Sequence, residues 1–156
     1  MAQIHLIIGK VCSGKSYRAQ RIAQELGAVI LSADEITRSL FPEGLGEAHD
    51  AVAARVRAYL LKKAGEIAGC GTDVIIDWGF WTRAMRQEAR NALAGHPCRW
   101  YYVDIPDDRW EENIRRRNVH ANDPGSLDYF VDEGLKAKCL SLFEIPSQDE
   151  YDVRLT

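Results

Sequence analysis

The sequence predicts an α/β fold in which helices cover both faces of a mainly parallel sheet. Short apolar runs alternate with helical segments along the whole chain, which is the pattern of parallel strands joined by crossover helices. The first apolar run also ends in a glycine-bounded loop, GKVCSGKS, that leads directly into a predicted helix. A chain of 156 residues has the length of one domain, which we expect to span residues 1–156.

The first half of the chain is predicted to hold two strands and three helices. The apolar run 3–8 indicates a strand buried on both faces, and a helix over 14–26 should follow it and end at a glycine. A second strand, 28–32, leads into an S-x-x-E pattern at Ser32, which predicts a capping box and the start of another helix. Apolar residues at helical spacing indicate the third helix, over 48–68.

The second half continues the alternation. Strand 72–77 precedes a helix over 81–94, and strand 99–105 precedes a helix that Pro106 should open, because proline is favoured in a first turn. Residues 119–126 carry the side chains of a turn-rich loop. The last two predicted elements are a helix over about 127–142 and an edge strand at 151–155.

Composition argues against several classes of protein. The net charge of −3 provides no global basic field for holding nucleic acid through counterion release. No apolar run reaches the length of a membrane span or resembles a signal peptide. The four cysteines form no CxxC pair. We therefore expect a cytoplasmic protein that needs neither a membrane nor an obligate protein partner.

The loop after the first strand matches G-x-x-x-x-G-K-[ST] in full. Glycines let the backbone turn its N–H groups inward around phosphate oxygens, and the next helix presents its positive end to the same anion. Lys15 can reach the β- and γ-phosphates, and the Ser16 hydroxyl can coordinate Mg²⁺. ATP and Mg²⁺ are the expected ligands. The loop residues predicted to hold them are Gly9, Lys10, Val11, Cys12, Ser13, Gly14, Lys15 and Ser16.

Two other classes of nucleotide-binding protein fit less well. A GTPase switch needs N-K-x-D, which is absent from the sequence, and D-x-x-G, whose nearest counterpart at residues 77–80 has its glycine one place early. A remodelling ATPase usually needs a larger chain and an arginine from a neighbouring subunit. This chain carries its own arginine run at 115–117, with Arg109 earlier on the same predicted helix. These arginines could close over the phosphates as a lid, or they could be a solvated helix end.

Two acids should lie at the carboxyl edge of the sheet, where ligands bind in this type of fold. Asp34 follows the second strand and could orient or deprotonate an acceptor hydroxyl, although acids are also favoured in a first helical turn. Asp77 ends the third strand and could hold Mg²⁺ through water, bind the acceptor, or cap the next helix. Arg38 and Trp78 are further candidates for acceptor binding, although aromatic side chains are more often core. Arg83, Arg86 and Arg90 share one helical face and are interpreted mostly as a solvated stripe.

The chain resembles small P-loop kinases of the AAA-domain ATP-binding type, a group related to polynucleotide kinase, chloramphenicol phosphotransferase and zeta toxins. The likeness covers nearly the whole length. The stretches that carry it are GKVCSGKS (9–16), LSADEITRSLFP (31–42), VIIDWGFWTRAMRQEAR (74–90), YVDIPDDRWEENIRRRN (102–118) and FEIPSQDE (143–150). The resemblance implies a P-loop NTPase fold with three αβα layers, strand order 2-3-1-4-5 and a short helical lid at about 106–126.

The resemblance also implies roles for particular residues. Asp34 corresponds to the acid that activates the acceptor, Arg117 to a lid arginine, and Asn118 to the second residue of an R-N pair. Related lids often carry another arginine one turn earlier, where this chain has Asn113. Which of Arg109, Arg115 and Arg116 assists Arg117 is therefore open, with Arg109 and Arg116 assigned to the nucleotide. The FEIP segment is implied to pack near the adenine.

The reaction expected from these features is transfer of the γ-phosphoryl group of ATP to a hydroxyl-bearing acceptor, most simply a small molecule. One alternative is a polynucleotide 5′-hydroxyl kinase, against which the acidic net charge and the short chain count. An alternative from another class is an ATP-binding sensor with negligible turnover. Fold and family likeness do not identify the acceptor.

Overall fold

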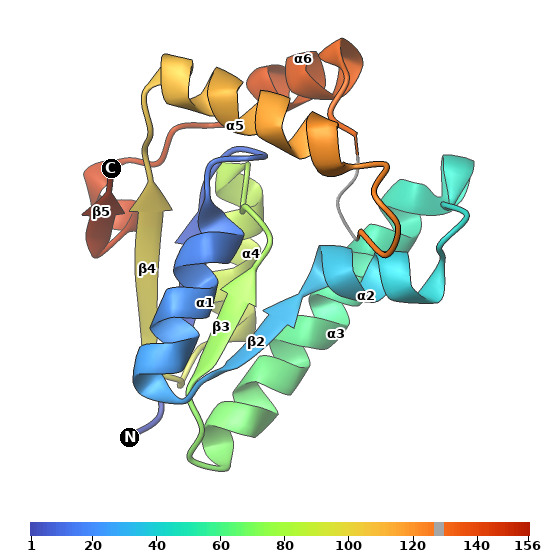
Figure 1. The fold of residues 1–156 in the computed structure, drawn as a ribbon. Helices are drawn as coiled ribbons and strands as arrows, with labels where there is room; N and C mark the ends of the chain where they lie inside the picture. Colours follow the sequence, from blue (N-terminus) through green and yellow to red (C-terminus); the bar gives the residue numbers. More distant parts are fainter. Residues whose placement is uncertain (127–129) are drawn as a thin grey trace.

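A five-stranded parallel sheet forms the centre of the fold (Figure 1). The structure, a computed structural model, describes residues 1–126 and 130–156. The strands are β1 Ile4–Ile8, β2 Val29–Ser32, β3 Val74–Asp77, β4 Cys98–Val103 and β5 Val153–Leu155. They stand in the order β2-β3-β1-β4-β5, and each neighbouring pair is parallel. The predicted P-loop fold and strand order are confirmed.

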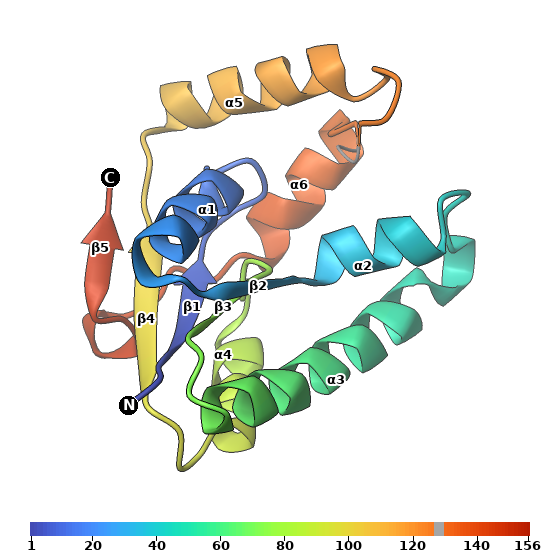
Figure 2. The same cartoon turned by 60° about the horizontal axis from the view of Figure 1, so that its bottom comes forward.

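Helices cover both faces of the sheet. They are α1 Lys15–Leu26, α2 Ala33–Leu40, α3 His49–Gly69, α4 Arg83–Ala92, α5 Asp107–His120 and α6 Glu133–Leu142, with short 3-10 turns at Gly46–Ala48 and Gln148–Glu150. Figure 1 shows α1 in front of the strands and α4 behind them. In both views α5 crosses above the carboxyl ends of the strands (Figures 1 and 2). Helix α5 lies within the segment 106–126 that is expected to form a lid, and its role as a lid stays a prediction.

The core has two halves because side chains of a strand alternate between its faces. In β1, Ile4, Leu6 and Ile8 pack into a cluster with α3 and α4. Ile7 points to the opposite face, into a cluster with α1, α5 and α6. All of β1 and β3 is buried, as expected for strands covered on both sides.

Capping residues set helix starts that differ from those predicted. Helix α4 begins at Arg83 because the Thr82 hydroxyl accepts a hydrogen bond from Met85 N at 3.1 Å. Helix α6 begins at Glu133 because the Asp132 carboxylate accepts one from Leu135 N at 2.7 Å. The predicted start of α6, at 127, lies outside the described residues. Within the described ranges, no helix is both long and apolar enough to cross a membrane.

Candidate functional site

The loop between β1 and α1 has the backbone conformation of a phosphate nest. Gly14 has φ +90°, and Cys12 adopts the left-handed region as well, with φ +58°. Such conformations turn successive N–H groups to one side of the backbone. Gly9 is required for another reason, because a Cβ there would lie 2.5 Å from Ser13 Oγ and 3.2 Å from Lys15 Cγ. The loop therefore closes on itself around its first glycine.

Lys15 and Ser16 lie at the start of α1 with their functional groups at the mouth of this loop. Lys15 Nζ donates a hydrogen bond to the Lys10 carbonyl oxygen at 2.6 Å, so its side chain spans the loop. Ser16 Oγ donates to Asp77 Oδ2 at 2.8 Å, joining α1 to the end of β3. A hydroxyl and a carboxylate held side by side provide the oxygen ligands that Mg²⁺ prefers.

Four charged groups from different elements converge near the loop. Desolvation lowers the pKa of Lys15 below its usual 10.5, while the charges of Asp77 and Asp34 act to raise it and Arg117 to lower it further. These side chains come from α1, the end of β3, α2 and α5. Asp77, Asp34 and Arg117 are thus each close enough to Lys15 for their charges to act on it, as expected where the carboxyl ends of parallel strands meet. All four are among the site residues that the sequence predicts.

Helix α5 is anchored on the phosphate loop by polar contacts. Trp110 Nε1 donates to the Val11 carbonyl oxygen at 2.6 Å, and Asn113 Nδ2 donates to that of Cys12 at 2.9 Å. Lys10 Nζ also lies 4.3 Å above the Trp110 ring. Asn113, which stands where related lids often have an arginine, therefore binds the loop backbone. This end of the lid is fixed to the loop in the described structure.

The arginines of α5 differ in exposure and in the charges that they approach. Arg115 and Arg116 are exposed, and both pair with Glu112 on their own helix, at 2.9 and 3.3 Å. Arg117 is partly buried and is the member of this run whose charge acts on Lys15. Arg109 is exposed near the start of the helix. The predicted contacts of Arg109 and Arg116 with the nucleotide remain predictions.

Asn118 connects α5 to the segment that precedes α6. Its Nδ2 donates to the Val131 carbonyl oxygen at 2.8 Å, and its Oδ1 accepts from the Val131 N–H at 2.7 Å. This pair of hydrogen bonds makes Asn118 a structural link between the two upper helices. The R-N pair thus combines Arg117, whose charge acts on Lys15, with a residue that fixes the helix carrying it.

On the acceptor side, Asp34 is exposed and Arg38 partly buried, both on α2. Ser32 caps this helix through a 3.2 Å hydrogen bond from Glu35 N, which is one of the two hydrogen bonds of the predicted capping box. Trp78 is partly buried, packs against the core and lies 5.0 Å from the Phe80 ring, centroid to centroid. The roles of Asp34, Arg38 and Trp78 toward an acceptor remain predictions.

The interpretation of Arg83, Arg86 and Arg90 as a solvated stripe was wrong for Arg86, and Arg90 is only partly exposed. Its side chain is only 1% exposed and forms a two-pronged ion pair with Glu150, at 2.9 and 3.2 Å. Sequence reasoning missed this pair because the spacing of the three arginines is also that of an exposed helical face, and Glu150 lies 64 residues away. The FEIP segment lies beside it, since Glu144 N donates to the Trp81 carbonyl oxygen at 2.8 Å.

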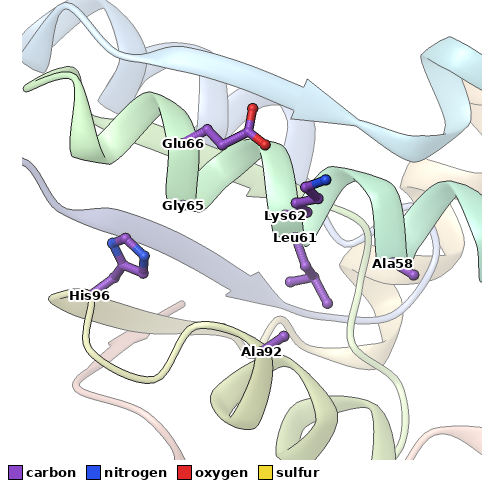
Figure 3. A pocket seen from close by; sticks show the side chains of 7 residues that line it. All are labelled: Ala58, Leu61, Lys62, Gly65, Glu66, Ala92 and His96. Carbon is purple, nitrogen blue, oxygen red and sulfur yellow. The ribbon is translucent and has the colours of Figure 1, made fainter.

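A separate groove lies between α3 and the end of α4 (Figure 3). Its lining residues are Ala58, Leu61, Lys62, Gly65, Glu66, Ala92 and His96. The His96 ring explains Gly65, because a Cβ there would lie 3.0 Å from His96 Nε2. None of the site residues predicted from the sequence lines this groove.

ATP and Mg²⁺, which the loop motif implies, fit the residues at the carboxyl edge. Ser13 Oγ is buried in the loop and has no hydrogen-bond partner within the described part of the chain. The nest of N–H groups likewise suits an anion, and Lys15 supplies positive charge beside it. Ser16 and Asp77 together offer oxygen donors for a hard divalent cation. The donor set therefore matches a phosphate chain with its metal ion.

Comparison with known proteins adds two findings. Residues 4–134 match the family described as an AAA domain. No curated protein matches the chain by sequence.

Several solved structures share the fold. A sugar kinase from Janibacter sp. has 19% identity and a TM-score of 0.69, over 99% of this chain and 85% of that one. The APS kinase of Mycobacterium tuberculosis in complex with AMPPNP and APS has 21% identity and a TM-score of 0.64, over 99% and 88%. Kti12 from Chaetomium thermophilum in complex with ADP-AlF3 has 14% identity and a TM-score of 0.73, over 98% and 88%.

Proposed function

The chain belongs to the AAA-domain family, and from this premise we propose that it is a kinase that uses Mg²⁺ and ATP to phosphorylate a hydroxyl group of a small molecule. The observation that carries the proposal is the convergence of Lys15, Asp34, Asp77 and Arg117 at the carboxyl edge of the sheet. A phosphate-binding loop alone would serve a switch or a sensor equally well. An acid and an arginine from two further elements beside that loop are the parts that group transfer requires.

The nucleotide side of the site follows from the loop. Inward N–H groups and the N-terminus of α1 bind phosphate oxygens, and Lys15 places its ammonium group on the β- and γ-phosphates. Ser16 and Asp77 hold the metal ion, which supplies charge neutralisation on the phosphates when bound. Desolvation lowers the pKa of Lys15, and phosphate charge would offset this effect.

The acceptor side is assigned to Asp34 and Arg117. Asp34 accepts a hydrogen bond from the acceptor hydroxyl and takes its proton on the carboxylate as the new P–O bond forms and the bond to the departing ADP oxygen breaks. Arg117 donates to the transferred group, whose charge is spread over its peripheral oxygens in the transition state. Helix α5, anchored on the loop through Trp110, covers the site and excludes water that would compete with the acceptor.

The small-molecule class is favoured over nucleic acid by charge. The net charge is −3, and the exposed arginines Arg115 and Arg116 are both paired with Glu112. A track along a polynucleotide backbone would instead need unneutralised cations in a row. Two of the structural neighbours, the sugar kinase and the APS kinase, are named for small-molecule acceptors.

Transfer of label from γ-labelled ATP tests the proposal. The protein would be incubated with Mg²⁺ and two separate acceptor pools, one of 5′-hydroxyl oligonucleotides and one of sugars, nucleosides and hydroxylated antibiotics. Label in the second pool is the expected result, and mass spectrometry would identify the product. Label in the oligonucleotide pool would mean that the acceptor is nucleic acid and not a small molecule. ATP binding without label in either pool or in a wider metabolite mixture would indicate a nucleotide sensor.

A further inference from the structure

The turn after β3 connects the metal-binding carboxylate to the phosphate loop. Asp77 ends the strand, and two residues later the Gly79 carbonyl oxygen accepts a 3.0 Å hydrogen bond from Gly9 N, the first residue of the loop. Gly79 has φ +77° and the buried Phe80 has φ +46°. A left-handed phenylalanine is strained and persists only where its surroundings hold it in place. The turn therefore needs an external support.

Arg86 provides that support from the first turns of α4. Its Nη1 donates to the carbonyl oxygens of Phe80 at 2.9 Å and Trp81 at 3.4 Å, both within the turn. The same nitrogen lies 3.1 Å from the Glu144 carbonyl oxygen, in the segment after α6. Its other two nitrogens bind the Glu150 carboxylate. One buried guanidinium thus joins the turn to the C-terminal segment.

The C-terminal segment is itself held firmly, so it can act as a fixed base. Glu150 Oε2 also accepts hydrogen bonds from Ser147 N at 2.9 Å and Ser147 Oγ at 3.2 Å. Glu144 Oε2 accepts from Arg83 N at 2.6 Å, at the start of α4. The Glu150 carboxylate neutralises the buried charge of Arg86, and the Nη1 group of Arg86 donates to the turn.

We propose that Arg86 is a positioning residue for the nucleotide and metal site: with Glu150 as its counter-ion, it fixes the turn 78–81 so that Asp77 and the Gly79 carbonyl stay against the phosphate loop. The inference rests on the proposed function, because it assigns Asp77 to the metal ion. Arginine is needed because its planar fork satisfies a carboxylate and several carbonyls at once. A lysine keeps the charge but has only three donors on a single nitrogen.

Binding of ADP measured by calorimetry with and without Mg²⁺ tests the inference without requiring the acceptor. The readout is the factor by which Mg²⁺ strengthens ADP binding. In Arg86→Lys this factor should fall about 10- to 100-fold, the usual effect of removing an outer-shell support of a metal site. Binding of metal-free ADP should change much less. A lesion that only lowers global stability would not alter this ratio at a temperature where both proteins are folded.

Arg90→Lys is the matched control. Arg90 lies one helical turn further along α4, donates to the Glu150 carbonyl oxygen at 2.6 Å and lies 4.5 Å from the Trp100 ring, where it can tie down the same C-terminal segment. In the described structure its side chain contacts Glu150 and Trp100, whereas the turn is contacted by Arg86. This variant should lose stability and keep the Mg²⁺ factor of the wild type.

Glu150→Gln covers the case in which Arg86→Lys does not fold. The amide keeps an oxygen for Arg86 but removes the counter-ion, so the Mg²⁺ factor should fall in the same direction by a smaller amount. If Arg86→Lys folds and keeps the Mg²⁺ factor of the wild type, the inference is overturned. If only Glu150→Gln folds, the same result in that variant overturns it. A fall of equal size in Arg90→Lys would overturn it too. Wild-type protein that binds ADP without any Mg²⁺ dependence would instead contradict the proposed function on which the inference rests.

Discussion

The buried ion pair between Arg86 and Glu150 makes the acid stability of the fold predictable. Burial raises the pKa of Glu150, but the Arg86 guanidinium and the Ser147 N–H outweigh this effect and lower it from 4.5 to about 2. The side chain of Glu150 is 7% exposed, so solvent screens these interactions little. Because the folded pKa is below the unfolded one, the stabilisation is present above pH 4.5 and is lost as pH falls through about 2.

The magnitude follows from the size of the shift. A difference of about 2.5 pKa units, from 4.5 to about 2, corresponds to about 3 kcal/mol of unfolding free energy at about 1.4 kcal/mol per unit. Glu150→Gln should therefore be about 3 kcal/mol less stable than the wild type at pH 7. At pH 2 the difference should nearly vanish, because the wild-type carboxyl has then lost most of its advantage.

Urea unfolding monitored by tryptophan fluorescence, at several pH values from 2 to 7, measures the unfolding free energy of the wild type and of Glu150→Gln as a function of pH. Glu88→Gln, which removes an exposed carboxylate from the same helix, controls for the loss of one charge. Its curve should follow that of the wild type. Curves for wild type and Glu150→Gln that stay parallel over the whole pH range would contradict this prediction, since the difference in stability would then not depend on titration of Glu150.

Three further predictions concern the loop and the lid. Because phosphate charge should raise the lowered pKa of Lys15, ADP binding at alkaline pH should take up protons. Calorimetry in buffers of different ionisation enthalpy measures this uptake, and observed heats that are the same in every buffer would contradict it. Trp110→Phe should cost about 1–3 kcal/mol in urea unfolding, because it leaves the buried Val11 carbonyl unpaired, and a stability equal to that of the wild type would count against this contact. Asn118→Ala should accelerate hydrogen exchange at the Val131 amide, whereas unchanged protection would mean that the link between α5 and the segment before α6 is not needed.

The phosphate loop and the sheet could be predicted because their signals are local. Gly9 to Ser16 form a contiguous motif, and a single run of apolar residues defines each buried strand. The position of Asp77 could be predicted as well, since the end of a parallel strand faces the ligand edge. Its 2.8 Å contact with Ser16 follows from that topology. Features that depend on residues close together in the chain can therefore be predicted from the sequence.

The support of the site could not be predicted because it is non-local. Arg86 faces Glu150 across 64 residues, and only the assembled fold shows that the helical face it shares with Arg83 and Arg90 is buried at its centre. The positive φ of Phe80 gives no sequence signal either, since phenylalanine rarely adopts that conformation. Helix α6 starts where Asp132 caps it, later than its apolar pattern indicates.

Asp34 and the phosphate loop are proposed to form one site for phosphoryl transfer. The most direct test compares transfer from γ-labelled ATP in wild type, Asp34→Asn and Glu35→Gln, the last being the adjacent acid of the same helical turn. We predict that Asp34→Asn lowers transfer by roughly 10²-fold or more while ADP affinity stays nearly unchanged, and that Glu35→Gln transfers at the wild-type rate. Equal transfer by wild type and Asp34→Asn would remove Asp34 from the reaction and contradict the account.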